Sequence, residues 1–451
     1  MSYPRSLGYS VSRLQGLSKN TFRIEASSAS EVGAGKVITV TLPENSIVDL
    51  QSLRMVINDV QMPFATALGQ TPAVRSVLGF AQSLFSRVEV SINGIQVSQG
   101  VNNSETAFRI LRNAGVNMTK SMSVDRALQN DSLDSTNTVT GAQSLSMICS
   151  DWMSFFNEKT STRYLDTSLT GTITLRMTLN SPFILSPAIN GHPFADPVLS
   201  VDEQNAVNVI KDQSYKIRDF YYLLDCLSVN DGFYDNLIRS QLSDTGFLPI
   251  NFKEYYTVIQ DGNTSAGSTV RFSTASQSID RIFSVVRASD YDATGQVCDP
   301  VNEPLQDANQ PYFCRFTCGA TGLAPNVRYQ YFINSVPHPN TKATLIEGLS
   351  HLIQMSNKVG MSAVGNQVGS IADYRDNKFC AGISLCMDDG TPDRLTGFDS
   401  RGTNAQMSLK LEGIETRQRG ANQQTNYSVL VLVETTATLR VGLGRSVEVI
   451  Y

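Results

Sequence analysis

The chain has 451 residues, of which 17% are charged and 41% are hydrophobic, and its formal net charge is -5. This balance excludes disorder driven by high charge and a helical bundle covered in charged residues. A chain of this length fits two large β-sandwich units or three average domains. No apolar run reaches about 18 residues, so we expect no membrane-spanning helix. Residues 1–20 lack the apolar segment of a secretion signal, so we also expect no Sec-type export.

The N-terminal segment is the most basic part of the chain. Arg5, Arg13, Lys19 and Arg23 all precede Glu25, the first acidic residue. A +4 arm on an acidic body is suited to a polyanion or an anionic membrane surface. An ordinary solvated terminus explains the same residues, and the sequence leaves both interpretations open.

Alternation of hydrophobic and polar residues predicts strands along the whole chain. The clearest case is 171–180, where Ile173, Leu175, Met177 and Leu179 fall on one face and mostly threonine falls on the other. A period of two over eight residues is typical of a half-buried strand. Further strands are predicted at 36–42, 86–93, 215–229, 407–412, 427–433 and 445–451.

Only two helices are predicted. One is capped by Ser104, carries Phe108, Ile110, Leu111 and Ala114, and ends at Gly115, and the other covers about 231–242. Because strands do not alternate with helices, a parallel α/β sheet is disfavoured and the class is mainly β and antiparallel. The long strand before residue 229 and the helix after it predict a division of the chain into two units near residue 229.

Two further patterns concern the organisation of the chain. The segments around Arg87 and Arg281 resemble each other weakly, which fits two copies of a sandwich of about 200 residues. Four stretches lack clear periodicity, namely 115–150, 182–213, 291–326 and 355–380. Loops of this length usually have a function, so we interpret them as surface towers or as contacts between subunits.

The sequence lacks an obvious catalytic set. The glycine-rich segment 30–37 has Val37 where a phosphate-binding loop needs Ser or Thr, so a loop entering a strand explains it better. No G-x-S-x-G or H-E-x-x-H motif is present. The Asp388–Asp389 and Asp290/Asp292 pairs lie in turn-like sequence, where side-chain turn formation explains them, although a glycosidase pair is not ruled out by spacing.

The seven cysteines are expected to be free thiols. Their number is odd, and a chain without a secretion signal rarely carries a disulfide framework. Cys314 and Cys318 have a spacing that zinc can use, with Cys298 and His338 not far away. Zinc pairs of strong predictive value are tighter and occur twice, so buried thiols are the simpler interpretation and we predict no metal or cofactor.

Several segments, in this order, resemble one family. The segment 82–96 contains Ser-Leu-Phe, alternating valines and Asn93-Gly94, and a short helix follows it. Five further segments also carry the resemblance, namely 215–229, 231–242, 278–287, 329–339 and 395–402. Together they resemble the double jelly-roll major capsid proteins of tailless icosahedral double-stranded DNA viruses, the lineage of Polintons, virophages and adenovirus-like viruses. Asn334-Ser335 stands where the family pattern has Asn-Gly.

The resemblance implies a fold and a role. It implies two consecutive eight-stranded antiparallel jelly rolls, at 30–229 and 230–451, with a few short helices and long loops, after a basic arm at 1–29. It also implies a non-enzymatic homotrimer that forms pseudo-hexagonal capsomers of an icosahedral shell, located in the virion. The implied partners are neighbouring capsomers and penton and minor capsid proteins, with an internal membrane or the genome facing Arg5, Arg13, Lys19 and Arg23.

Two alternative functions remain from the sequence. One is a minor capsid or vertex protein. The other is a β-sandwich carbohydrate-binding protein or glycosidase, which the single tryptophan, Trp152, makes less attractive because sugar sites favour stacking aromatic residues.

Overall fold

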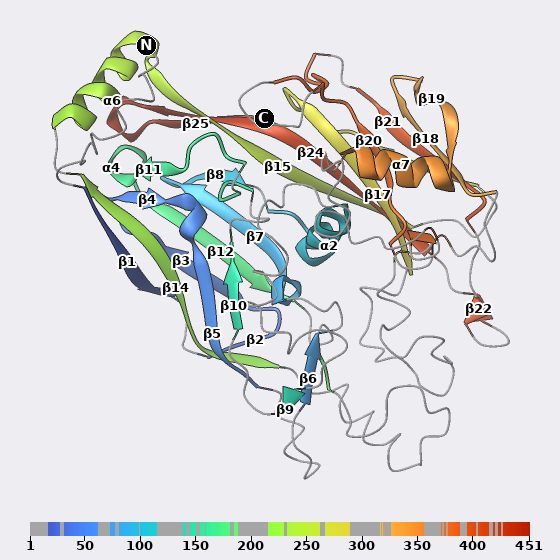
Figure 1. Cartoon of the computed structure of the whole chain (residues 1–451), viewed down its shortest axis with the longest axis horizontal. Helices are drawn as coiled ribbons and strands as arrows, with labels where there is room; N and C mark the ends of the chain where they lie inside the picture. Colours follow the sequence, from blue (N-terminus) through green and yellow to red (C-terminus); the bar gives the residue numbers. More distant parts are fainter. Residues whose placement is uncertain are drawn as a thin grey trace, which may run out of the picture.

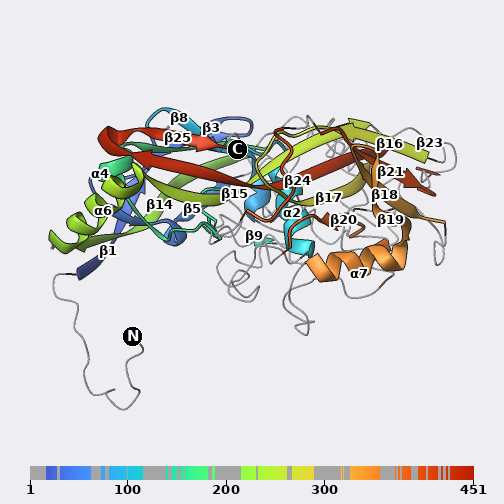
Figure 2. The same cartoon turned by 90° about the horizontal axis from the view of Figure 1, so that it is seen from above.

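The computed structural model describes residues 17–27, 31–61, 73–76, 81–98, 100–114, 139–140, 145–149, 154–157, 159–180, 185–187, 215–229, 232–261, 267–288, 316, 318, 326–355, 371, 374–375, 378–387, 395–402, 405–414, 418–419, 423–424 and 427–451. Figure 1 shows two groups of strands side by side along the long axis, with the first half of the chain on the left. Figure 2 shows that the long strand β24 (Tyr427–Gly442) runs from the second group toward the first.

The first group is a sandwich of two sheets built from residues before 230. In one sheet the main order is β1 (Leu17–Glu25), β14 (Lys216–Val229), β5 (Arg54–Gln61) and β10 (Leu145–Ile148). Three short strands extend it, β2 (Glu31–Gly33), β4 (Ile47–Asp49) and β11 (Tyr164–Asp166). The other sheet has the order β3 (Val37–Thr41), β12 (Ile173–Leu179), β7 (Phe85–Ile92) and β8 (Ile95–Ser98).

The second group repeats this arrangement after residue 246. One sheet has the order β15 (Phe247–Asp261), β24, β17 (Ile279–Ala288) and β20 (Ala381–Ser384), and β25 (Val447–Ile450) also pairs with β24. The other has the order β16 (Gly267–Phe272), β21 (Met407–Glu412), β18 (Arg328–Ile333) and β19 (Val336–Thr344). Small additional sheets contain β6 (Ala73–Ser76), β9 (Val139–Thr140) and β13 (Leu185–Pro187), and β22 (Gln418–Arg419) with β23 (Gln423–Gln424).

Both sandwiches therefore use eight main strands in one order. Counted along the chain, one sheet reads first, eighth, third, sixth, and the other reads second, seventh, fourth, fifth. This is the order of a jelly roll, in which antiparallel strands fold into two facing sheets. Every strand pairing among the described residues stays on one side of residue 229. The predicted fold class, two consecutive eight-stranded antiparallel jelly rolls, is confirmed.

The repeat corrects two sequence-based expectations. Because β1 occupies the same position as β15, the first jelly roll includes Leu17–Glu25, and part of the predicted arm is a strand. The proposed correspondence of Arg87 and Arg281 is wrong. Arg87 lies on the fourth strand of its jelly roll, whereas Arg281 lies on the third. The fourth strands, β7 and β18, are the true counterparts.

The alternating segments form strands as predicted. On β12 the four apolar side chains are buried and Arg176 between them is exposed, and β3 and β7 flank β12 in antiparallel register. Glu31–Gly33 and Val37–Thr41 are strands joined by a turn at Gly35 (φ 71°), so the glycine-rich segment leads from strand to strand. It does not open a helix, which a phosphate-binding loop requires.

Equivalent two-residue hairpins join the fourth and fifth strands of each jelly roll. Asn93 and Gly94 have φ of 49° and 80°, and Asn334 and Ser335 have φ of 48° and 70°. Positive φ at both positions defines the turn type that matches the twist of the flanking strands. Ser335 carries a side chain at a position where glycine is favoured.

A helix follows the hairpin in each jelly roll. These equivalent helices are α2 (Ser104–Ala114) and α7 (Leu345–Met355). Two further α-helices are α4 (Thr167–Thr170) and α6 (Gly232–Thr245), the latter close to the predicted 231–242. Ser104 is the first residue of α2, and its hydroxyl donates to the Phe85 carbonyl on β7 at 2.6 Å, so it ties the helix to the sheet.

Two hydrophobic cores fill the sandwiches, and each includes residues from the other half of the chain. The first contains Ile250 and Phe252 of β15 and Leu439 and Val441 of β24. The second contains Ala107, Ile110, Leu111 and Ala114 of α2. The two jelly rolls therefore complete each other.

Candidate assembly surfaces and the contact between the jelly rolls

Two of the four predicted arm residues, Lys19 and Arg23, lie on β1. Lys19 Nζ lies 2.6 Å from Asp225 Oδ2 on the neighbouring strand β14. Arg23 pairs with Glu25 at 2.6 Å, and its guanidinium lies 4.0 Å from the centre of the Tyr221 ring. Arg5 and Arg13 lie outside the described residues.

The charges of β1 are thus matched within the chain. A hydrogen bond to Asp225 raises the pKa of Lys19. Burial works against the Asp225 carboxylate, but the hydrogen bonds that Lys19 and Thr21 donate to it lower its pKa overall. Both shifts favour the ionised pair, which holds β1 against β14.

The edge of the first jelly roll is exposed along β1. Within the described residues, β1 pairs only with β14, over all nine positions. Its side chains from Ser18 to Arg23 are exposed, and Phe22 is 45% exposed. An edge strand of this kind offers unpaired backbone groups to another chain, and flanking charges limit uncontrolled pairing.

The contact between the two jelly rolls, which we call the seam, is centred on α2. Phe108 packs into the first core, whereas Ile110 and Leu111 pack into the second. Polar contacts follow the same path. Arg287 Nη1 on β17 donates to Thr106 Oγ1 at 3.3 Å, and Ser98 Oγ on β8 donates to Glu254 Oε1 on β15 at 3.1 Å.

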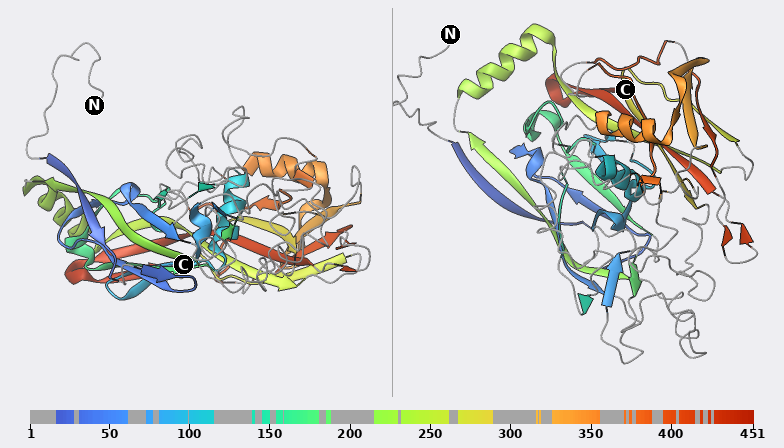
Figure 3. Two further views of the ribbon diagram at one scale, coloured as in Figure 1. Left: turned by 90° about the horizontal axis from the view of Figure 1, so that it is seen from below. Right: turned by 45° about the vertical axis from the view of Figure 1, so that its right-hand side comes forward.

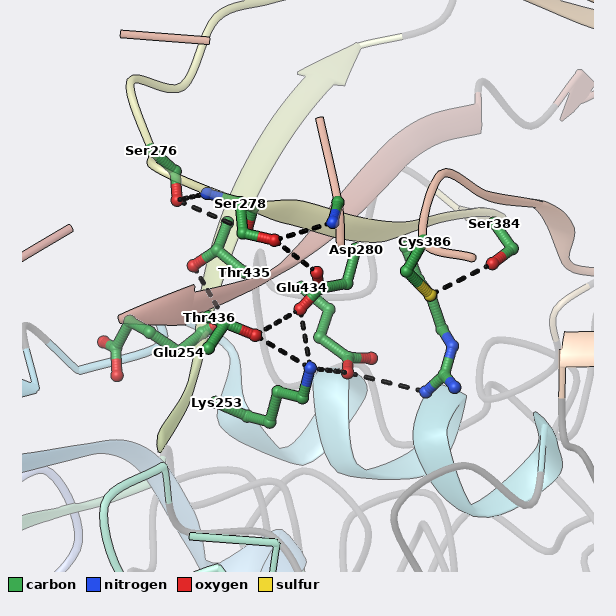
Figure 4. A network of polar contacts seen from close by, with 12 residues as sticks. Lys253, Glu254, Ser276, Ser278, Asp280, Ser384, Cys386, Glu434, Thr435 and Thr436 are labelled. Atoms are coloured by element: carbon green, nitrogen blue, oxygen red, sulfur yellow. Dashed lines mark hydrogen bonds and ion pairs between the residues drawn. The ribbon is translucent and has the colours of Figure 1, made fainter. Parts of the chain in front are cut away.

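A buried charge network lies on β15, β17 and β24 of the sheet that faces α2 (Figure 4). Lys253 Nζ donates to Asp280 Oδ2 at 2.6 Å and to Thr436 Oγ1 at 2.9 Å, and Glu434 Oε1 lies 3.8 Å away. Arg281 Nη1 contacts the same oxygen of Glu434 at 3.5 Å. The four charged residues balance one another in sign, and each is almost fully buried.

A neighbouring carboxylate affects the pKa of Arg281 in this network. Burial opposes the charged form of Arg281, but Glu434 raises the pKa of its guanidinium overall. Asp280 accepts additional hydrogen bonds from Ser278 Oγ at 2.7 Å and Thr436 Oγ1 at 2.5 Å. Buried ion pairs and hydrogen bonds of this kind stabilise one arrangement of the three strands.

A shallow cavity of about 640 Å³ opens where β7 and β12 meet β15. Its lining residues are mostly polar and uncharged, with Arg87 and Ile259 as the exceptions: Ser86, Arg87, Asn102, Asn103, Thr178, Thr257 and Ile259. The lining contains neither a carboxylate pair nor an aromatic side chain, so neither glycosidase chemistry nor sugar stacking is supported at this cavity.

The cysteines, His338, Trp152 and the acidic pairs are the remaining candidates for metal binding, sugar binding or catalysis. Cys318 is buried and its thiol donates to the Arg375 carbonyl, and burial raises the pKa of Cys380 to about 12. His338 lies on β19, and no cluster of three metal-ligating side chains occurs within the described part of the chain. The other candidate residues lie outside the described part: Trp152, Asp290, Asp292, Cys298, Cys314, Asp388 and Asp389. None of the described helices is long and apolar enough to cross a membrane.

Sequence reasoning did not identify α7 or the charge network. A capping box marks the start of α7, because Glu347 Oε2 accepts from Thr344 N at 2.7 Å and Thr344 Oγ1 accepts from Glu347 N at 3.4 Å. The T-x-x-E pattern at 344–347 is the sequence signal for this helix. The network residues had no comparable signal, since their partners lie on three strands far apart in the chain.

Comparison with known proteins agrees with this architecture at the level of fold. No family model matches the chain, and no curated protein matches it. The PBCV-1 protein VP54, in a crystal structure fitted into a reconstruction of the virophage Sputnik, matches with a TM-score of 0.60 at 12% identity over 98% of both chains. The Faustovirus major capsid protein matches with a TM-score of 0.54 at 9% identity over 98% of this chain and 93% of its own.

A third solved structure extends the comparison. The mavirus major capsid protein matches with a TM-score of 0.50 at 10% identity over 100% of this chain and 96% of its own. The likeness spans both jelly rolls. The chain therefore has the fold of these viral major capsid proteins, in a single chain of two jelly rolls.

Proposed function

We propose that this protein is the major capsid protein of an icosahedral double-stranded DNA virus and acts as a structural, non-enzymatic component of the virion shell. The observation that carries the proposal is the match of both jelly rolls, in order and almost end to end, to the Faustovirus and mavirus major capsid proteins. A likeness restricted to one jelly roll would fit many β-sandwich proteins, because one fold hosts many functions.

The physical properties of the chain support a shell-forming role. The two sandwiches share buried side chains across the seam, and the described cavity lacks catalytic groups. Charged residues are scarce in the chain, and the seam buries several of them. A surface with few charges suits extensive contact with copies of itself, because charged side chains are depleted in the centres of protein interfaces.

We further propose that three copies form the assembly unit, a capsomer of pseudo-hexagonal outline that contributes two jelly rolls per copy. Three copies of the 49.3 kDa chain have a mass of about 148 kDa. Light scattering after size-exclusion chromatography tests this directly, and negative-stain micrographs test the hexagonal outline. A monomer at all concentrations would contradict the proposal.

The alternatives make different predictions. A minor capsid or vertex protein assembles as five-fold or low-copy units and not as hexagonal capsomers, so counting copies in purified particles separates it from the shell protein. A carbohydrate-binding protein binds sugars as a monomer. The cavity between β7, β12 and β15 has no stacking aromatic side chain, which does not favour that function.

For the N-terminal segment we propose inward contacts through Arg5 and Arg13, to an internal membrane, the genome or minor capsid proteins. Lys19 and Arg23 have acidic partners on β1 and β14, which makes them suitable controls. We expect the R5S/R13S variant to impair particle assembly, because it removes positive charge from the N-terminal segment and leaves the sequence of β1 unchanged. Particles of normal yield and content from that variant would contradict this proposal.

A further inference from the structure

The equivalent helices α2 and α7 differ in how much of their surface is covered. In α2 every side chain the structure describes is buried, including Glu105, Arg109 and Asn113. The helix lies between its own jelly roll, through Phe108, and the second jelly roll. Figure 3 shows α2 between the two groups of strands and α7 against one face of the second group.

One side of α7 packs on its own jelly roll. The buried residues on this side are Leu345, Gly348, Leu352 and Met355. Gly348 allows the close approach, since a Cβ there would lie 2.9 Å from the Tyr329 ring. Up to this point α7 matches α2, because each helix follows a hairpin with positive φ and packs on its own sandwich.

The apolar surface of α7 is wider than the part that packs on its own jelly roll. At about 100° per residue, Ile346, Leu349 and Ile353 share one side of the helix, next to the buried side. Ile346 is 72% exposed and Ile353 is 43% exposed, while Leu349 packs partly against the core. The remaining polar side is formed by Glu347, His351 and Gln354.

We propose that this exposed strip, Ile346, Leu349 and Ile353, docks against the first jelly roll of a second copy of this chain. Within one chain, the equivalent helix α2 is covered by the second jelly roll. Because α7 is in contact with α2, the strip on α7 extends the seam to a position where another copy can cover it. The proposal rests on the proposed function only for the expectation that copies associate.

The geometry sets the kind of interface. A helix of 11 residues is about 16 Å long, so it covers only part of the roughly 800 Å² that each partner contributes to a stable interface. The strip therefore acts as the apolar centre of a larger contact, which is where interaction energy concentrates. A head-to-tail contact between the second jelly roll and the next copy's first jelly roll closes into a ring when the rotation allows it.

A charge introduced into this strip tests the proposal. We expect I346K/I353K to weaken association at least about 100-fold, because an unpaired charge in an apolar contact is desolvated without compensation. Leu443, 70% exposed on the turn after β24, provides a matched control as L443K. Sedimentation of the three proteins over a concentration series measures the effect.

The outcomes separate the inference from the proposed function. If the natural sequence associates and I346K/I353K associates equally well, the docking inference is wrong and the proposed function is unaffected. Equal dissociation of L443K and I346K/I353K also overturns the inference, because the effect is then not specific to α7. If the natural sequence is itself a monomer, the proposed function fails first.

A second experiment identifies the occupant without depending on the double substitution. A photo-reactive phenylalanine analogue replaces Ile346, and the protein is assembled from a mixture of ¹⁴N- and ¹⁵N-labelled copies. We expect mixed-isotope crosslinks from position 346 to peptides within 17–229. Crosslinks to 230–451 of another copy, or none between copies in an associating sample, contradict the proposal.

Discussion

Lys253 offers the sharpest test of how β15, β17 and β24 are held together in the second jelly roll. Its ammonium is almost fully buried and contacts Asp280 at 2.6 Å, Thr436 at 2.9 Å and Glu434 at 3.8 Å. Replacing it by methionine keeps the volume and removes the only positive group near Asp280 among these contacts. Breaking a buried ion pair in this way costs about 3–5 kcal/mol, because the remaining charge stays desolvated.

The remaining contacts place a limit on that cost. Asp280 keeps two hydroxyl donors, and Glu434 keeps Arg281 at 3.5 Å, so neither carboxylate is left without a partner. We therefore expect about 3 kcal/mol, the lower end of the range. For cooperative units of about 200 residues this corresponds to a loss of roughly 6–12 °C in Tm.

A surface ion pair of the same unit provides the control. Lys342 Nζ contacts Glu412 at 2.6 and 2.8 Å but is 43% exposed. K342M should change the unfolding free energy by less than about 1 kcal/mol. Thermal and urea unfolding of both variants at one protein concentration measures the difference. A K253M variant as stable as K342M would refute the reasoning that the buried network holds β15, β17 and β24 together.

Three further predictions follow from the fold. S335G should raise the unfolding free energy by about 1 kcal/mol because Ser335 has φ of 70°, and G94S at the equivalent turn should lower it by a similar amount, as measured by urea denaturation. The folded-state pKa of Asp225 is lowered, so its contribution to stability is present above the unfolded pKa of about 3.9 and is lost as pH falls through the folded value. Amide hydrogen exchange of β1 should therefore become faster below pH ~4, and this increase should be smaller in D225N. Residues 1–229 alone should lack a cooperative unfolding transition but should recover one when coexpressed with 230–451, since β15 and β24 complete the first core; calorimetry of both samples checks this.

Local patterns predicted the strands that have one buried face. The apolar positions of β12, β3 and β7 alternate with polar residues, and no distant residue is needed to assign them. The same reasoning ended β24 at Val433, although the strand continues to Gly442. Its next three residues, Glu434, Thr435 and Thr436, are polar and buried, because Lys253, Arg281 and Glu254 satisfy them. A prediction that assumes buried residues are hydrophobic ends the strand where buried polar residues begin.

The candidate arm was harder to interpret because its partners are distant in sequence. Lys19 and Arg23 form a basic cluster in the sequence, yet Asp225 and Asp219 approach them only once β1 pairs with β14. The internal repeat was also misaligned. The segments around Arg87 and Arg281 look alike in sequence, but Arg87 lies on the fourth strand of its jelly roll and Arg281 on the third. The hairpin residues Asn93 and Asn334 align the repeat correctly.

The two kinds of contact made by one helix position suggest how such a chain separates folding from assembly. Inside the chain, α2 is fixed by apolar packing together with the Arg287–Thr106 and Ser98–Glu254 hydrogen bonds. Buried polar groups are costly when misaligned, so we infer that this seam specifies one register of the two jelly rolls. The strip on α7 is apolar, and its docking depends on concentration because the partner is a separate copy. The seam can therefore form first and present α7 to the next copy already in its final orientation.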